Sequence, residues 1–105
     1  MAQFDVYANP NKKSQDAFPF IVDIQNPIIN GLATRLVIPM TKTDNLRNLT
    51  LGKLTPSITY KEQHYILLTP QLTSLPSELL KNPIGTIKDH RDAIISAIDF
   101  AITGI

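Results

Sequence analysis

Eight prolines are spread between Pro10 and Pro83 in this chain of 105 residues. Proline lacks the backbone N–H that strand ladders and helix interiors need, so it usually lies at strand ends, sheet edges and turns. Prolines at this density divide the chain into short segments. The sequence therefore predicts a body of short strands joined by turns.

The composition fits one small domain over residues 1–105, because 43% hydrophobic residues are enough for a single core. The formal net charge is +1 and only 18% of the residues are charged, which argues against a primary nucleic-acid binder or a partner of anionic membranes. The chain has no cysteine, and hence no disulfide framework, thiolate nucleophile or Cys-based zinc site. Apolar runs are short and the first residues do not form a basic, apolar leader, so we expect a soluble intracellular protein.

Alternating apolar and polar residues predict two strands, over residues 3–7 and 18–25, in an antiparallel hairpin around a polar loop. Ile21, Asp23 and Gln25 share one face of the second strand, and this mixed face predicts partial exposure. A β-branched run over 34–40 predicts a central strand that is stopped by Pro39. The remaining segments are a second hairpin (57–60 and 64–69 around 61–63), an irregular loop or short edge strand (41–55), and the end of the strand-rich part (73–76).

One helix is expected after the loop that ends at Gly85. Thr86 and Asp89 have the spacing of a capping pair, and Gly104 is placed to end the helix. An apolar stripe recurs at helical spacing, and a polar face lies opposite it. The stripe is Ile87, Ile94, Ile98, Ile102 and Ile105, and the polar face is Asp92, Ser96, Asp99 and Thr103.

The sequence contains no recognisable catalytic or metal-binding pattern. His64 and His90 each lack a second histidine at metal-ligand spacing, and Asp89 with Asp92 is explained by the helix dipole. The four glycines are isolated, so no phosphate-binding loop exists, and no hydroxyl lies in a nucleophile motif. We therefore expect no catalytic residue, metal or cofactor, and a protein that is not an enzyme.

Two apolar groups lie where solvent usually reaches. Ile28 and Ile29 precede the turn dipeptide Asn30–Gly31, and residues 102–105 end the chain with two isoleucines. Taken singly, each group is explained by packing in the core or in a dimer, because isolated apolar residues at element ends are common.

Several segments, in order and spacing, resemble the CcdB family of toxins, which poison DNA gyrase. They are Gln3–Phe4, Val6–Tyr7, Val22–Gln25 followed by Ile28–Ile29, Arg35–Pro39, Thr73–Pro76 and Gly104–Ile105. The resemblance implies a mainly β, SH3-like small barrel with an antiparallel main sheet, a small three-stranded sheet and one C-terminal helix. It also implies a homodimer in the bacterial cytoplasm, in which the C-terminal helices meet at the two-fold axis.

By the same resemblance, the protein is the toxin of a type II toxin–antitoxin module that binds the gyrase A subunit and traps the cleaved-DNA complex. The gyrase-binding positions that it implies are Asn26, Ile28, Ile29, Asp99, Ile102, Thr103, Gly104 and Ile105. Thr103 stands where the best-known member has a tryptophan that stacks on an arginine of gyrase, and the lost aromatic is worth about 1–2 kcal/mol per copy. We expect poisoning to persist and to rest more on the isoleucines.

The family pattern also implies a CcdA-like antitoxin, whose disordered C-terminal segment folds on the toxin. The candidate contacts are Asn9, Asn11, Lys12, Lys13, Asp44, Leu46, Leu49 and Leu51. Toxin and antitoxin together repress their operon in this family. The antitoxin supplies the DNA-binding part, which agrees with the near-neutral charge of this chain.

Two alternatives remain at this stage. An mRNA-cleaving toxin of the MazF and Kid type has the same fold, but it needs a basic surface for RNA, and the three arginines Arg35, Arg47 and Arg91 form no cluster in the sequence. A degenerate toxin with weak or no gyrase activity is equally compatible with the residues.

Overall fold

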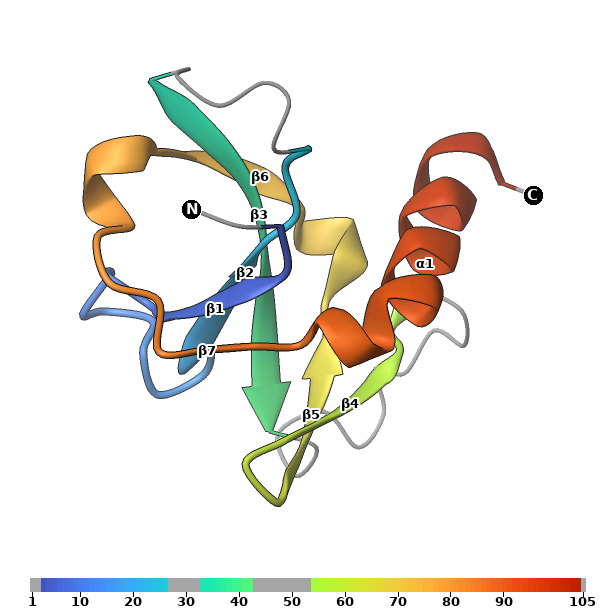
Figure 1. The fold of residues 1–105 in the computed structure, drawn as a ribbon, viewed down its shortest axis with the longest axis horizontal. Helices are drawn as coiled ribbons and strands as arrows, with labels where there is room; N and C mark the ends of the chain where they lie inside the picture. Colours follow the sequence, from blue (N-terminus) through green and yellow to red (C-terminus); the bar gives the residue numbers. More distant parts are fainter. Residues whose placement is uncertain (1–2, 27–32, 43–53, 105) are drawn as a thin grey trace.

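The described strands of the computed structural model form one curled antiparallel sheet, and a single α-helix follows it (Figure 1). The structure describes residues 3–26, 33–42 and 54–104. The strands are β1 (Asp5–Ala8), β2 (Phe20–Asp23), β3 (Thr34–Lys42), β4 (Ser57–Tyr60), β5 (Gln63–Leu67), β6 (Thr73–Pro76) and β7 (Gly85–Thr86). The helical elements are the 3-10 turns η4 (Thr69–Gln71), η5 (Ser77–Leu79) and η6 (Lys88–His90), and the helix α1 (Arg91–Thr103). This architecture confirms the prediction of a mainly β small barrel with a C-terminal helix.

The central strand β3 organises the sheet. One of its edges pairs with β2 over Val37–Met40, and the other pairs first with β6 and then with β5. The smaller three-stranded part consists of β4, β5 and the end of β3, so it is continuous with the main part. Pro39 does not stop β3, which runs on to Lys42, because the Pro39 carbonyl still accepts a hydrogen bond from the Leu68 amide at 2.9 Å.

Each face of the sheet carries an apolar cluster of its own. Successive residues of a strand point to opposite faces, and accordingly Val6 belongs to the cluster that includes Ile94 of α1, whereas Tyr7 belongs to a second cluster with Leu80. Asp23 and Gln25 are 0% and 3% exposed. The prediction of partial exposure for this face of β2 was therefore wrong, because Asp23 and Gln25 have their partners, Arg35 and the Leu36 amide, on the neighbouring strand β3, and Ile21 packs in the cluster with Leu80.

The strands β6 and β7 were not predicted as strands. Residues 73–76 were interpreted as the end of the strand-rich part, yet they pair with β3 in the register Leu36↔Ser74. β7 is only two residues long and pairs with β1. Short edge strands that contain or follow proline carry little alternation, so sequence periodicity does not detect them.

The helix α1 begins later than the capping pair indicated. Thr86 lies in β7, and its hydroxyl oxygen accepts a hydrogen bond from the Lys88 amide at 3.2 Å just before the 3-10 turn η6, whereas the N-cap residue of α1 is His90. Ile94 and Ala97 face the sheet and are buried. The helix ends at Gly104, whose φ of 75° is the left-handed conformation that glycine adopts without strain.

The hairpin between β4 and β5 turns on Lys61 and Glu62, which both have positive φ (51° and 64°). Two successive left-handed residues match the twist of the flanking strands, although Asn–Gly suits this turn better. None of the helices in the described ranges has the length and apolar character needed to cross a membrane.

Candidate functional site

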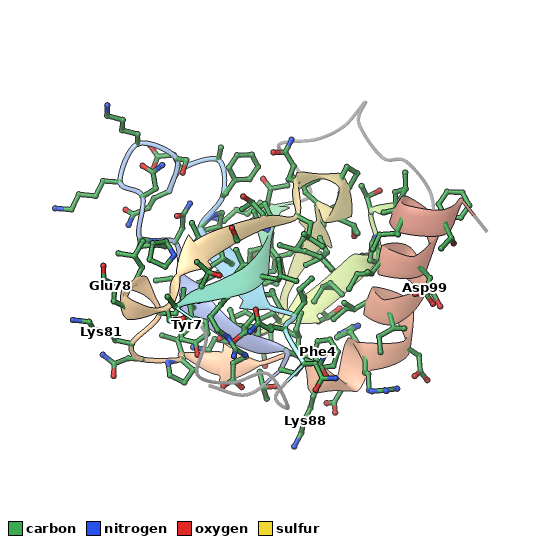
Figure 2. All side chains as sticks on the ribbon, turned by 90° about the horizontal axis from the view of Figure 1, so that it is seen from above. Phe4, Tyr7, Glu78, Lys81, Lys88 and Asp99 are labelled. Atoms are coloured by element: carbon green, nitrogen blue, oxygen red, sulfur yellow. The ribbon has the colours of Figure 1, made fainter. Side chains whose placement is uncertain are left out.

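The last turn of α1 presents an apolar side chain to solvent. Ile102 is 74% exposed, the largest exposed fraction among the large hydrophobic residues of the described ranges. Asp99 and Thr103 lie on the exposed surface of the same turn, and the Thr103 hydroxyl donates to the Asp99 carbonyl at 2.6 Å. Figure 2 shows Asp99 on the side of α1 that points away from the sheet. The apolar stripe thus changes role along the helix, from core at Ile94 to surface at Ile102.

An apolar groove of about 390 Å³ borders this helix end. Four parts of the chain form it: η4, Leu72 directly after η4, the second half of α1, and Leu54. Its lining residues are Leu54, Thr69, Pro70, Leu72, Ile98, Phe100, Ala101 and Ile102. The groove and Ile102 make one continuous apolar surface, which is the kind of surface that soluble proteins use to bind other proteins.

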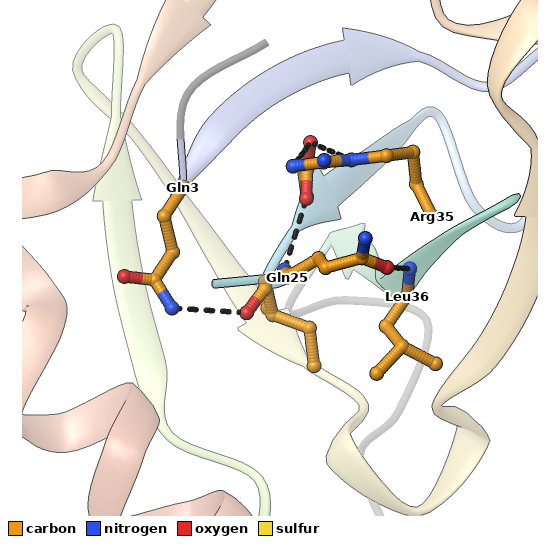
Figure 3. Close-up of polar contacts among 6 residues, drawn as sticks. Gln3, Gln25, Arg35 and Leu36 are labelled. Atoms are coloured by element: carbon orange, nitrogen blue, oxygen red, sulfur yellow. Dashed lines mark hydrogen bonds and ion pairs between the residues drawn. The ribbon is translucent and has the colours of Figure 1, made fainter. Parts of the chain in front are cut away.

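A buried polar network fixes the neighbouring ends of β2 and β3 (Figure 3). The Asp23 carboxylate accepts hydrogen bonds from the Arg35 guanidinium, with Nε at 2.9 Å and Nη2 at 2.8 Å. It also accepts one from the backbone N–H of Gln25 at 3.0 Å. The Gln25 side-chain carbonyl in turn accepts from the Leu36 amide at 3.1 Å. The Gln3 side-chain amide donates to the Ile24 carbonyl at 3.0 Å, so the segment before β1 is also hydrogen-bonded to the end of β2.

The comparison with known families agrees with this fold. A family model described as "CcdB protein" matches residues 3–104 of the 105 in the chain. The chain belongs to the CcdB family. Its members are toxins of toxin–antitoxin systems, so the surface at the end of α1 belongs to a CcdB-family toxin.

The structure brings together four of the gyrase-binding positions expected for a CcdB protein. Asp99, Ile102, Thr103 and Gly104 are all exposed and form the end of α1. Asn26 is also exposed, but it follows β2 and is not part of this helix. The other expected positions, Ile28, Ile29 and Ile105, lie outside the described residues.

The expected antitoxin contacts of this CcdB chain are placed only in part. Asn11, Lys12 and Lys13 are exposed on the loop between β1 and β2. Asn9 is buried, and its side-chain amide donates to the Ser14 hydroxyl at 3.0 Å and to the Phe18 carbonyl at 2.8 Å. Asn9 therefore shapes the loop from within. Asp44, Leu46, Leu49 and Leu51 lie outside the described residues.

Sequence reasoning missed the Asp23–Arg35 pair, although a signal for it exists. Each charged residue interrupts an otherwise apolar strand, and a buried charge generally requires a partner. The pairing Asp23↔Val37 places the Asp23 side chain two residues along β3 from Arg35. Only the strand register, which local sequence does not reveal, makes the two side chains partners.

The two histidines of this CcdB fold lie on different elements. His64 is exposed on β5 and His90 lies on η6, far along the chain. No group of three or more His, Cys, Asp or Glu side chains that could hold a metal occurs among the described residues. Burial raises the pKa of Tyr7, and the neighbouring Asp5 and Asp23 raise it further, while Arg35 opposes them.

Proposed function

We propose that this CcdB-family toxin binds the A subunit of DNA gyrase with the end of α1 and traps the cleaved-DNA complex. The observation that carries the proposal is the exposure of Ile102 at 74% beside Asp99, Thr103 and Gly104. Burying an exposed isoleucine side chain completely is worth about 1.5–3 kcal/mol. A partner that covers Ile102 gains part of this free energy. Membership of a toxin family supports the view that this partner is the molecule on which the toxin acts.

In this proposal the toxin itself does no chemistry. It binds one conformation of gyrase, the state with cleaved DNA, more tightly than the others and so increases its population. The double-strand breaks then come from the catalytic groups of gyrase. A protein that acts in this way needs an exposed apolar contact and a complementary shape, but no catalytic centre and no basic surface.

The nature of residue 103 determines how the contact is made. Thr103 has no aromatic ring for stacking on a cation, and its hydroxyl already donates to the Asp99 carbonyl inside the helix. The binding energy therefore rests on Ile102 and on Ile28, Ile29 and Ile105. We expect deletion of Ile105 to abolish poisoning.

A DNA-cleavage assay with purified gyrase and supercoiled plasmid tests the proposal. Ile102→Ala removes most of the exposed side chain at a site with little packing in the monomer, so it should reduce cleavage about tenfold or more without lowering the unfolding midpoint. The matched control is Leu79→Ala, because Leu79 is an exposed apolar residue (47%) on η5, away from α1. Undiminished cleavage by both Ile102→Ala and the Ile105 deletion would refute the assignment.

Expression without antitoxin separates the alternatives. Killing that is lost only in cells whose gyrase is altered at the toxin-binding cavity supports the proposal. Killing in both strains with fragmented mRNA indicates a ribonuclease, and no killing in either strain indicates a degenerate toxin.

We further propose that the toxin is a homodimer in which the two α1 ends lie side by side. The part of the apolar groove lined by Pro70, Leu72 and Ile98 supports this proposal, because a second copy that covers it still leaves Ile102 at the helix end open to gyrase. Sedimentation equilibrium should give about twice the 11.7 kDa chain mass. A monomer at micromolar concentration would contradict it.

We also propose that a CcdA-like antitoxin binds the toxin. The antitoxin neutralises it, and the two proteins together repress their operon. Lys12 and Lys13 offer exposed positive charges on the loop that Asn9 shapes, and they suit a partner segment with acidic residues. Lys12→Glu combined with Lys13→Glu should weaken antitoxin binding in calorimetry and leave gyrase cleavage unchanged. Operator DNA should bind the complex but not the toxin alone.

A further inference from the structure

The loop between β1 and β2 is longer than the connection requires, and its backbone is ordered. Residues 9–19 separate the two strands, although a two-residue turn is enough to join an antiparallel pair. Within the loop, the Ser14 amide donates to the Asn11 carbonyl at 3.1 Å, and the Phe18 amide donates to the Ser14 carbonyl at 2.8 Å. Loops of this kind, held in one conformation on a rigid scaffold, are common places for binding residues.

Asn9 is the buried centre of this loop. Its side-chain amide donates to the Ser14 hydroxyl at 3.0 Å and to the Phe18 carbonyl at 2.8 Å. Its side-chain carbonyl accepts from the Asn11 amide at 2.9 Å, and its backbone carbonyl accepts from the Gln15 side-chain amide at 2.7 Å. Both donors and the acceptor of the Asn9 side chain are thus used within the loop.

The hydrogen bonds continue from Asn9 to the two lysines. The Asn11 side-chain carbonyl accepts from the Lys13 amide at 3.0 Å. Asn9 therefore fixes the backbone at Asn11, and Asn11 fixes the backbone at Lys13. Lys12 and Lys13 are exposed, and in the described ranges neither side chain takes part in an ion pair. The loop thus presents two positive charges on an ordered backbone.

The base and the far side of the loop are also fixed. The Asn9 amide donates to the Pro19 carbonyl at 3.1 Å, which closes the base. The Thr41 hydroxyl, on the buried end of β3, donates to the Ala17 carbonyl. Movement of the loop as a whole is therefore restricted, so its conformation depends mainly on the contacts of Asn9.

We propose that Asn9 is a positioning residue for antitoxin binding, which holds Lys12 and Lys13 in the arrangement that the antitoxin meets. The role rests on the proposed antitoxin contact at these lysines. Asn9 is too deeply buried to be a contact itself. A toxin loop that is already ordered adds no ordering cost to that of the partner segment. If only a fraction of the loops is in the binding conformation, the observed affinity falls by the same fraction.

Hydrogen exchange and calorimetry with the purified antitoxin of the same module test the proposal. Asn9→Ala should speed amide exchange at Lys13 and Ser14 about tenfold, and raise the dissociation constant for antitoxin about tenfold. Asn11→Ala changes an exposed residue, so it should weaken binding without lowering the thermal midpoint. Asn11→Ser should restore most of the affinity, because a serine hydroxyl can accept from the Lys13 amide.

Two controls separate positioning from a loss of stability. Ile94→Val shortens a buried side chain of α1, so it should lower the thermal midpoint and leave antitoxin binding unchanged. DNA cleavage by gyrase with Asn9→Ala should equal that with the wild type at a temperature where both are folded. In a double-mutant cycle, Asn9→Ala should weaken binding little once Lys12→Gln and Lys13→Gln are present, because the loop then has no charges to position.

The outcomes distinguish this role from the lysine contact on which it rests. Unchanged affinity in both Asn9→Ala and Asn11→Ala would overturn the positioning role and leave the lysine contact intact. Additive effects of Asn9→Ala and the lysine changes, or equal weakening by Ile94→Val, would overturn it as well. If Lys12→Gln with Lys13→Gln binds antitoxin as the wild type does, the proposed lysine contact is wrong, and the role of Asn9 falls with it.

Discussion

The carboxylate of Asp23 and the guanidinium of Arg35 form an ion pair at 2.8 Å in which both side chains are almost fully buried (0% and 2% exposed). Taking two charges out of water is costly, so such a pair adds little net stability, but losing one partner leaves an uncompensated charge. The pair joins β2 to β3 at the ends that lead into residues 27–32. The pair is compatible with only one register of these two strands, the one that sets Asp23 opposite Val37.

Asp23→Asn should lower the free energy of unfolding by about 3–5 kcal/mol, because Arg35 stays charged and loses its carboxylate. The double variant Asp23→Leu with Arg35→Met should recover most of that loss. Urea denaturation followed by circular dichroism measures both. The control is Asp92→Asn, which breaks the exposed contact between Arg91 and Asp92 and removes a negative charge from the first turn of α1, so it should cost less than about 1 kcal/mol. A single variant as stable as the wild type would show that the pair is dispensable.

The turn between β4 and β5 offers a stabilising change. Glu62 has a φ of 64°, a conformation that costs about 1 kcal/mol for most residues but not for glycine. Glu62→Gly should raise the free energy of unfolding by up to about 1 kcal/mol, less the extra chain entropy of glycine in the unfolded state. Lys61 is left in place because its ammonium group lies 5.4 Å from the Tyr60 ring centroid. A lower thermal midpoint for Glu62→Gly would contradict the turn assignment.

The elements predicted correctly are those with a strong local pattern. The alternating segments became β1 and β2, the β-branched run became β3, and the isoleucine stripe with Gly104 became α1. The same local reasoning located an exposed apolar end at residue 102.

The errors all concern non-local relationships. Asp23 and Gln25 looked half-exposed because the groups that bind them, the Arg35 guanidinium and the Leu36 amide, come from the neighbouring strand β3. Thr86 looked like the cap of α1, but pairing of β7 with β1 places it in the sheet. The groove beside α1 is likewise built from several distant segments, so it could not be predicted from the sequence.

Gly85 is constrained by the ring of Tyr60. A Cβ atom at position 85 would lie 2.3 Å from the Tyr60 hydroxyl oxygen, which itself donates to the Ile84 carbonyl at 3.2 Å. Tyr60 is 6% exposed in the main core cluster, so its ring cannot move without repacking. Gly85→Ala should therefore lower the free energy of unfolding by about 1–3 kcal/mol. The combination with Tyr60→Phe should cost less than the sum of the two single changes if this clash is the cause.

The raised pKa of Tyr7 predicts a loss of stability at alkaline pH. The folded state favours the neutral phenol, whereas the unfolded chain ionises near pH 10, so this contribution is complete below pH 10. It is lost as the pH rises toward the folded-state pKa. Denaturation midpoints at pH 9 and pH 11 measure the effect. Tyr7→Phe should have a shallower decline, and some slope should remain because burial also raises the pKa of Tyr65. An unchanged slope would mean that Tyr7 is solvated.

Gly104 allows the stability of α1 to be separated from its contacts. Its φ is 75°, and an added Cβ would meet no atom within 4 Å, so the only cost of Gly104→Ala in the monomer is backbone strain of about 1 kcal/mol. Gly104→Asn should cost less, because asparagine tolerates this conformation better. If gyrase covers the end of α1, however, any side chain at this position intrudes on the contact, and both variants should lose DNA cleavage far beyond their small loss of stability. Cleavage that falls only in proportion to stability would place gyrase elsewhere on the molecule.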